Sequence, residues 1–337
     1  MSNQHGVVGR QFKWPLVVVA VLASLSAGAE PNKKVPRIGY VEPFGSYWNE
    51  PVPVFQAFRA GMVEHGLVEG RDYVMELRDA QGKPERYPEL TEELVRLPVD
   101  LFLVNVCGAP MNAARQATKT IPIVVPTCND DMVETGLVKS LARPGGNVTG
   151  LSKLTPELAA KRLSLLKQTL PRLSKVAVLW NPNYSDFKAD WRELRSAAKR
   201  LGVTLHPVEF RRPEEYEAAF AAMSAEHVDA LITFSDTLTF SFADQVAKRA
   251  AAANVPAMFA FREVPDAGGL MSYGPNLRDM WYRCADYVAR ILKGVNPADM
   301  AIEQPERFEF VINVKAAKAL GIAIPADVLL QADQIIE

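Results

Sequence analysis

Polar and aromatic residues gather in the short segments that directly follow the β-branched, apolar runs of this sequence. If those runs form parallel strands, the segments meet at one edge of a sheet, where ligands bind in open α/β folds. Their hydroxyl, amide and aromatic groups can hold a small solute by hydrogen bonds and ring contacts. The residues predicted to bind a ligand are Ser46, Tyr47, Cys107, Gly108, Asn129, Asp131, Asn183, Tyr184, Asp236, Arg262 and Tyr273.

Several of these residues have an alternative structural role. Asp131 and Asp236 stand just before predicted helices, where Asp commonly caps the free N–H groups of the first turn. The two roles are compatible, because the same N–H groups and the helix dipole attract a carboxylate. Arg262 can bind an anionic ligand, or it can pair with Glu263, Asp266 or another surface acid. The tyrosines can line a cavity or pack between two lobes.

These segments contain no coherent catalytic set. A cysteine nucleophile needs a nearby histidine base, but none of the four histidines lies in a segment with Cys107 or Cys128. No Gly-x-Ser-x-Gly motif occurs, and neither phosphate-binding glycine motif follows the first strand. No Cys-x-x-Cys or His-x-x-x-His spacing supports a metal site. We therefore predict a protein that is not an enzyme and that uses no cofactor and no metal.

The elements that must position these residues alternate regularly between strand and helix from Arg37 onward. Strand-like runs occur at residues 38–41, 73–77, 101–106 and 123–125, and helical patterns lie between them, with a further helix near residues 134–141. A second series of the same kind starts near residue 156. Strict alternation predicts βαβ units and parallel sheets. The fold class is therefore α/β, with two doubly wound parallel-sheet lobes.

The length and charge fit this organisation. The chain has 337 residues, which suggests about two domains. Its 38 basic and 39 acidic residues give a net charge of -1, without the basic surplus of a nucleic-acid binder. Hydrophobic residues make up 48% of the chain, too many for a disordered protein. We predict no nucleic-acid partner.

The first 29 residues are predicted to be a cleaved signal peptide. Arg10 and Lys13 precede an apolar run at residues 14–25, and Ala27-Gly28-Ala29 gives a small-residue cleavage site. An uncleaved anchor is the alternative, but the run is shorter than a membrane span needs. No cysteine follows the site, so we do not expect a lipoprotein. Removal of this segment takes the net charge from -1 to -3, and export favours disulfides.

Two of the three cysteines are candidates for such a bond. Cys107 and Cys128 follow strands that should be neighbours in a parallel sheet, so their side chains can come within bonding distance. Buried free thiols are the alternative. Cys284 lies in a late predicted helix and is expected to remain unpaired.

Several longer segments resemble a known family. The residues concerned include Thr120-Ile121-Pro122-Ile123-Val124, Ser140-Leu141-Ala142-Arg143-Pro144-Gly145-Gly146-Asn147-Val148-Thr149-Gly150, Val176-Ala177-Val178-Leu179-Trp180-Asn181-Pro182, Gly268-Gly269-Leu270-Met271-Ser272-Tyr273-Gly274, and Glu303-Gln304-Pro305. Together they are similar to the substrate-binding proteins of ABC transporters, in the group of tryptophan-type binding proteins. The resemblance covers about residues 37–337. Where that family commonly has a Gly-Asp-Pro run, this chain has Asp130-Asp131-Met132, and Cys107-Gly108-Ala109 replaces a Thr-rich loop, so we transfer no amino-acid specificity.

The resemblance implies a type I periplasmic-binding-protein fold, with two lobes joined by a hinge that the chain crosses several times. Residues 30–150 and about 264–300 are expected to form the N-terminal lobe. Residues 151–263 and about 301–337 are expected to form the C-terminal lobe. The cleft between the lobes should close on a ligand that contacts both.

The predicted function is that of a monomeric periplasmic receptor in transport. It should capture a small polar, anionic or zwitterionic solute and deliver it to the permease of an ABC transporter. The alternative is a ligand-sensing domain of a signalling system, which uses the same fold.

Overall fold

A computed structural model describes residues 34–45, 47–153, 157–182, 188–305 and 307–337. The predicted signal peptide and three predicted ligand-binding residues, Ser46, Asn183 and Tyr184, lie outside this description. Within the described ranges, no helix has the length and the apolar character that a membrane span requires.

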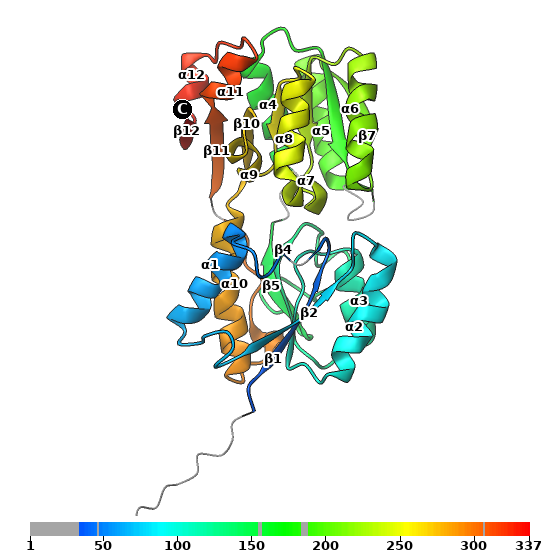
Figure 1. Cartoon of the computed structure of the whole chain (residues 1–337), viewed down its shortest axis with the longest axis vertical. Helices are drawn as coiled ribbons and strands as arrows, with labels where there is room; N and C mark the ends of the chain where they lie inside the picture. The colour runs from blue at the N-terminus through cyan, green and yellow to red at the C-terminus, as the bar shows by residue number, and fades with distance from the viewer. Residues whose placement is uncertain (1–33, 46, 154–156, 183–187, 306) are drawn as a thin grey trace, which may run out of the picture. The chain divides into compact units, whose positions relative to one another are not determined.

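The first lobe is built on a five-stranded parallel sheet with the strand order β2-β1-β3-β4-β5. Helices α1 and α10 cover one face, and α2 and α3 cover the other (Figure 1). Helix α1 begins with a proline at its first position, and its apolar side chains Val54, Phe55, Phe58 and Met62 are buried against the sheet. The strands are β1 (Arg37–Glu42), β2 (Val74–Asp79), β3 (Leu101–Leu103), β4 (Ile123–Cys128) and β5 (Val148–Ser152), and the helices are α1 (Pro53–Glu64), α2 (Tyr87–Arg96), α3 (Ala109–Ala117) and α10 (Leu277–Leu292).

The second lobe contains a seven-stranded sheet with the order β12-β11-β10-β9-β8-β6-β7. Helices α4 and α5 share one apolar cluster on this sheet, and α6 and α8 share another. The strands are β6 (Lys175–Trp180), β7 (Thr204–Glu209), β8 (Ala230–Thr233), β9 (Ala257–Phe259), β10 (Met271–Pro275), β11 (Phe308–Asn313) and β12 (Gln334–Ile336). The helices are α4 (Glu157–Thr169), α5 (Lys188–Leu201), α6 (Tyr216–Ala225), α7 (Thr237–Ser241), α8 (Ala243–Ala252), α9 (Glu263–Asp266), α11 (Val314–Ala319) and α12 (Ala326–Leu329). Across both lobes, the described residues also form short 3-10 helices at Pro84–Arg86, Pro213–Glu215 and Pro297–Asp299.

The predicted α/β class with two parallel-sheet lobes is confirmed, with one departure in strand direction. Strand β11 runs antiparallel to β10, whereas the other strand pairs of both sheets are parallel. The chain can therefore add β11 next to β10 without a right-handed crossover, since an antiparallel neighbour needs none.

The helix predicted near residues 134–141 is absent. This segment forms turns instead. The Asp131 carboxylate accepts hydrogen bonds from the backbone N–H groups of Val133 at 2.9 Å and Glu134 at 3.0 Å. Gly136 then has a φ of 65°. A carboxylate that binds the following N–H groups favours a turn over a helix, and a left-handed glycine ends helical geometry.

The chain crosses between the lobes three times. It leaves the first sheet after β5, returns after β10 to form α10, and leaves again before β11. The boundary predicted near residue 264 is wrong, because β10 pairs with β9 and β11 inside the second sheet. Residues of α10, such as Trp281 and Cys284, share an apolar cluster with Phe55 and Phe58 of the first lobe.

Candidate functional site

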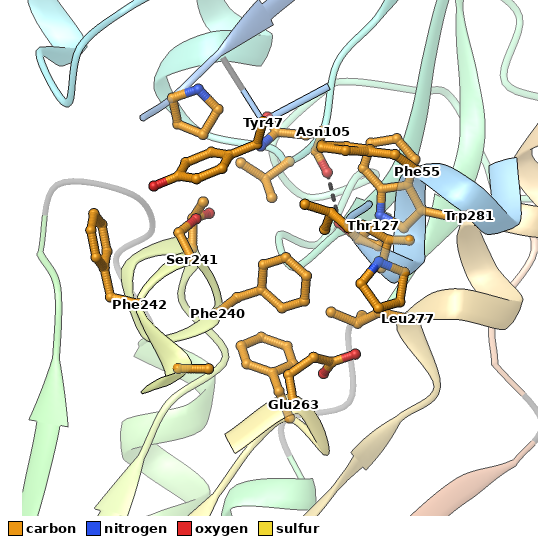
Figure 2. Close-up of a pocket in the computed structure, with 18 of the residues that line it drawn as sticks. Tyr47, Phe55, Asn105, Thr127, Phe240, Ser241, Phe242, Glu263, Leu277 and Trp281 are labelled. Atoms are coloured by element: carbon orange, nitrogen blue, oxygen red, sulfur yellow. Dashed lines mark hydrogen bonds between the residues drawn. The ribbon is translucent and has the colours of Figure 1, made fainter. Parts of the chain in front are cut away.

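A cavity of about 420 Å³ lies between elements of the two lobes. This volume is within the usual range of small-molecule sites. One side comes from β1 and the segments after it, from α1 and from α10, and the other comes from α7, the start of α8 and the segment after β9 (Figure 2). The residues that line the cavity include Tyr40, Glu42, Tyr47, Phe55, Asn105, Thr127, Lys153, Asp236, Phe240, Phe242, Asp244, Phe261, Glu263, Leu277 and Trp281.

Aromatic rings from both lobes line the cavity. The rings of Phe55 and Trp281 meet edge to face with centroids 5.2 Å apart. The rings of Phe240 and Phe261 meet in the same way at 5.7 Å, and Figure 2 shows Phe240 extending between the two sides of the cavity. Such rings provide flat apolar surface with little loss of conformational freedom.

Lys153 is a buried cation of the cavity. Its backbone N–H donates to the Cys128 carbonyl at 2.7 Å, which joins it to the end of β4. Its Nζ lies 4.8 Å from the centroid of the Phe261 ring, a cation–π contact. Burial lowers the pKa of Lys153 to about 8, although the carboxyls of Asp236 and Asp190 oppose the decrease.

Asp236 caps helix α7 and also lines the cavity. Its carboxylate accepts the Thr239 backbone N–H at 2.9 Å and the Thr239 hydroxyl. Burial raises the pKa of Asp236 to about 6 despite these bonds. The capping role expected for Asp236 is therefore confirmed, and its contact with a ligand stays a prediction.

Three further groups bring oxygen acceptors to the cavity. The Glu42 carboxylate accepts the backbone N–H of Trp48 at 2.5 Å, and burial raises the pKa of Glu42 to about 7. No other described residue gives a hydrogen-bond partner to either carboxylate oxygen of Glu263, and the Oδ1 atom of Asn105 has no partner among the described residues. Burial also raises the pKa of Glu263.

Some predicted residues lie outside the cavity wall. The structure brings Tyr47 and Asp236 to the wall, but it gives Arg262 ion pairs to Asp266 and Glu309. The acid-pairing alternative for Arg262 therefore applies in this structure. The ring of Tyr273 packs near those of Phe308 and Phe310 in the second sheet.

The remaining predicted residues have structural contacts near the sheet edge. Cys107 and Cys128 form a disulfide with Cα atoms 4.9 Å apart, and Gly108 precedes α3 with a φ of 86°. Cys284 is free and buried. Asn129 donates from Nδ2 to the Ser235 carbonyl at 3.1 Å, which joins the two lobes. Asp131 holds the turn described above.

Sequence reasoning missed several residues of the cavity wall. Lys153 follows β5 directly, so the rule that ligands bind beyond strand ends could have found it. Phe240 and Trp281 lie on helices, where an aromatic residue in an amphipathic pattern resembles a core residue. Only the returning course of α10 places Trp281 beside Phe55.

The described residues offer no metal site, since no three His, Cys, Asp or Glu side chains gather among them. The charged groups of the cavity and its aromatic wall suit an organic solute instead. They can bind such a solute without a covalent step.

This chain is similar to known proteins in sequence and in fold. Residues 53–336 match the family described as ABC transporter substrate binding protein. A tyrosine-binding protein of Clostridioides difficile is 26% identical over 79% of this chain and 76% of its own length. A conserved domain protein of Vibrio cholerae has a TM-score of 0.80 at 27% identity, covering 90% of this chain and 100% of that one. An ABC domain of Streptococcus pneumoniae, solved with L-Trp, has a TM-score of 0.79 at 24% identity and covers 89% of this chain and 99% of its own.

Proposed function

We propose a specific transport role for this chain, which belongs to the family of ABC transporter substrate-binding proteins and has the type I periplasmic-binding-protein fold. It captures a small solute with a flat apolar body and a polar head group in the cavity between its lobes, and it delivers that solute to a membrane permease. The predicted signal peptide would export this receptor to the periplasm. We propose that it acts there as a monomer and catalyses no reaction.

The single observation that carries this proposal is the composition of the cavity wall. Aromatic rings from both lobes, including Phe55, Phe240 and Trp281, surround a cavity of about 420 Å³. Lys153 and Asp236 also line this cavity. A small amphipathic molecule fits this combination, because apolar surfaces bury its body and charged groups orient its head. The tyrosine-binding relative supports a solute of this general kind.

The proposed mechanism is closure of the lobes on the solute. Only a ligand with contacts to both lobes favours the closed state, since a ligand with equal affinity for both states shifts nothing. Trp281 is on the side of the first lobe and Phe240 on the side of the second. A flat solute between them would provide such contacts.

Titration calorimetry tests this function directly. The protein is titrated with a panel of amino acids, dicarboxylates, aromatic acids and aromatic amines. We expect at least one member with an apolar ring to bind, and small-angle scattering to show a more compact protein after binding. Failure of every member to bind, or turnover of any member into a product, would refute the function.

A pair of matched variants locates the binding site. Phe240→Leu removes a ring from the cavity wall, whereas Phe308→Leu removes an equally half-buried ring outside it. We expect Phe240→Leu to weaken binding about tenfold, in line with the 0.5–1.5 kcal/mol of an aromatic contact plus lost apolar area. Phe308→Leu should leave affinity unchanged. Equal losses in both variants would place the site elsewhere.

A further inference from the structure

The cavity carries an excess of carboxyl groups. Among the described residues that line it are the four acids Glu42, Asp236, Asp244 and Glu263, against Lys153 as the one basic residue. An anionic solute would add negative charge to this wall. A cationic solute would instead reduce the repulsion among the carboxylates, which is strong where water is excluded.

The cation already present in the cavity has acidic neighbours. The Lys153 ammonium interacts electrostatically with the carboxyls of Asp236, Asp190 and Glu263, and it lies over the Phe261 ring. An anionic head group would have to compete with these acids for one ammonium. Arg262, the other basic residue expected to attract an anion, is paired with Asp266 and Glu309 outside the cavity.

The groups of the wall that lack hydrogen bonds are acceptors. Among the buried side-chain atoms described, those that have no partner and belong to cavity-lining residues are Oε1 and Oε2 of Glu263 and Oδ1 of Asn105. The nearest cation to Glu263 is the Nε atom of Arg278 at 3.9 Å, beyond hydrogen-bond distance. A buried carboxylate with few donors is costly. Among the described residues, none places a positively charged donor within hydrogen-bond distance of the Glu263 carboxylate.

We propose that the cavity selects its solute by a protonated amine, that Glu263 is the carboxylate that receives this ammonium, and that a carboxylate on the solute is dispensable. The apolar body of the solute lies among the aromatic rings, whose faces also attract cations. This inference rests on the proposed function and names the chemical class of its ligand as an aromatic amine.

Three probes that share a phenol ring and a short chain test this inference by calorimetry. Tyramine carries only the ammonium, tyrosine carries both head groups, and 3-(4-hydroxyphenyl)propionate carries only the carboxylate. We expect tyramine to bind at least as tightly as tyrosine and the propionate at least tenfold more weakly than either. A propionate that binds as tightly as tyramine would overturn the inference and leave the solute-binding function intact.

The wider panel separates the two proposals. If no aromatic amine of the panel binds but a solute of another class does, the aromatic amine is the wrong class and the function stands. If no solute binds at all, the function itself fails, and the inference fails with it.

A matched pair of variants tests the role of Glu263. Glu263→Gln removes the charge but keeps the shape, and Asp266→Asn removes a charge from the same short helix outside the cavity. Both acids lie near Arg278. We expect Glu263→Gln to weaken tyramine binding at least tenfold without weakening the propionate, whereas Asp266→Asn changes tyramine binding less than twofold. Equal effects of the two variants would contradict the assignment.

A measurement on the unmodified protein gives an independent test. Burial raises the pKa values of Glu42, Asp236 and Glu263, so a bound cation should promote their ionisation. Tyramine binding near pH 6.5 should therefore release protons, which calorimetry in buffers of different ionisation enthalpy detects. Proton uptake, or no exchange, would contradict the proposal even if Glu263→Gln does not fold.

Discussion

Removal of the Cys107–Cys128 disulfide should destabilise the protein without changing its fold. The bond joins Cys107, which follows β3, to Cys128, the last residue of β4, and the two are 21 residues apart. A cross-link mainly restricts the unfolded chain, and the chain-entropy relation for a loop of roughly this size gives about 3 kcal/mol. We therefore expect reduction of the bond to lower the free energy of unfolding by about 3 kcal/mol.

Urea unfolding of four samples measures this effect. The unmodified protein and a Cys107→Ala/Cys128→Ala variant are each unfolded with and without a reducing agent. Reduction should lower the midpoint of the unmodified protein and should not affect the variant, whose remaining Cys284 is already a buried free thiol. The variant should also be somewhat less stable than the reduced protein, since both cysteines are buried in an apolar cluster.

Two outcomes would refute the reasoning. If reduction leaves the midpoint of the unmodified protein unchanged while thiol titration shows that the bond is broken, the disulfide does not constrain the unfolded chain as argued. If reduction lowers the midpoint of the variant equally, the effect arises elsewhere. The dependence of the unfolding free energy on urea concentration should be similar in samples that expose the same surface area on unfolding.

Two further predictions concern packing and pH. A Cβ added at Gly274 would lie 2.0 Å from the Ala260 carbonyl oxygen, so Gly274→Ala should cost about 1–3 kcal/mol in urea unfolding, whereas Gly146→Ala, with open space around it, should be neutral. Burial raises the pKa of Glu42 from 4.5 to about 7, so the folded protein keeps a proton that the unfolded chain loses in that window. The free energy of unfolding should therefore fall as the pH rises from 4.5 to 7, by roughly 3 kcal/mol at most. Thermal melts of Glu42→Gln should show a weaker dependence on pH. A pH profile that is the same in this variant as in the unmodified protein would contradict the prediction.

The sequence predicted the elements better than their assignment to lobes. Alternating apolar runs identified the strands because the period of side-chain burial is local information. The place where the chain returns to the first lobe depends on strand pairing between distant segments. Residues 271–275 form strand β10, yet only the pairing of β10 with β9 and β11 shows which sheet this strand completes.

The candidate site was predictable only in part, for a similar reason. Tyr47 and Asp236 follow strands and line the cavity. Arg262 also follows a strand. Whether its side chain binds a ligand or pairs with Asp266 and Glu309 depends on where Glu309 of β11 lies. Sequence position alone carries no information about that competition between partners.

The three crossings between the lobes also affect how the protein can fold. Helix α10 lies between two strands of the second lobe in the sequence, but it covers Phe55 and Phe58 of the first lobe. During synthesis, which starts at the N-terminus, the chain cannot complete the apolar core of the first lobe until α10 has been made, near the end of the protein. That apolar surface stays exposed in the interval and needs protection from aggregation. For the same reason, no single cut in the chain yields either lobe as an intact folding unit.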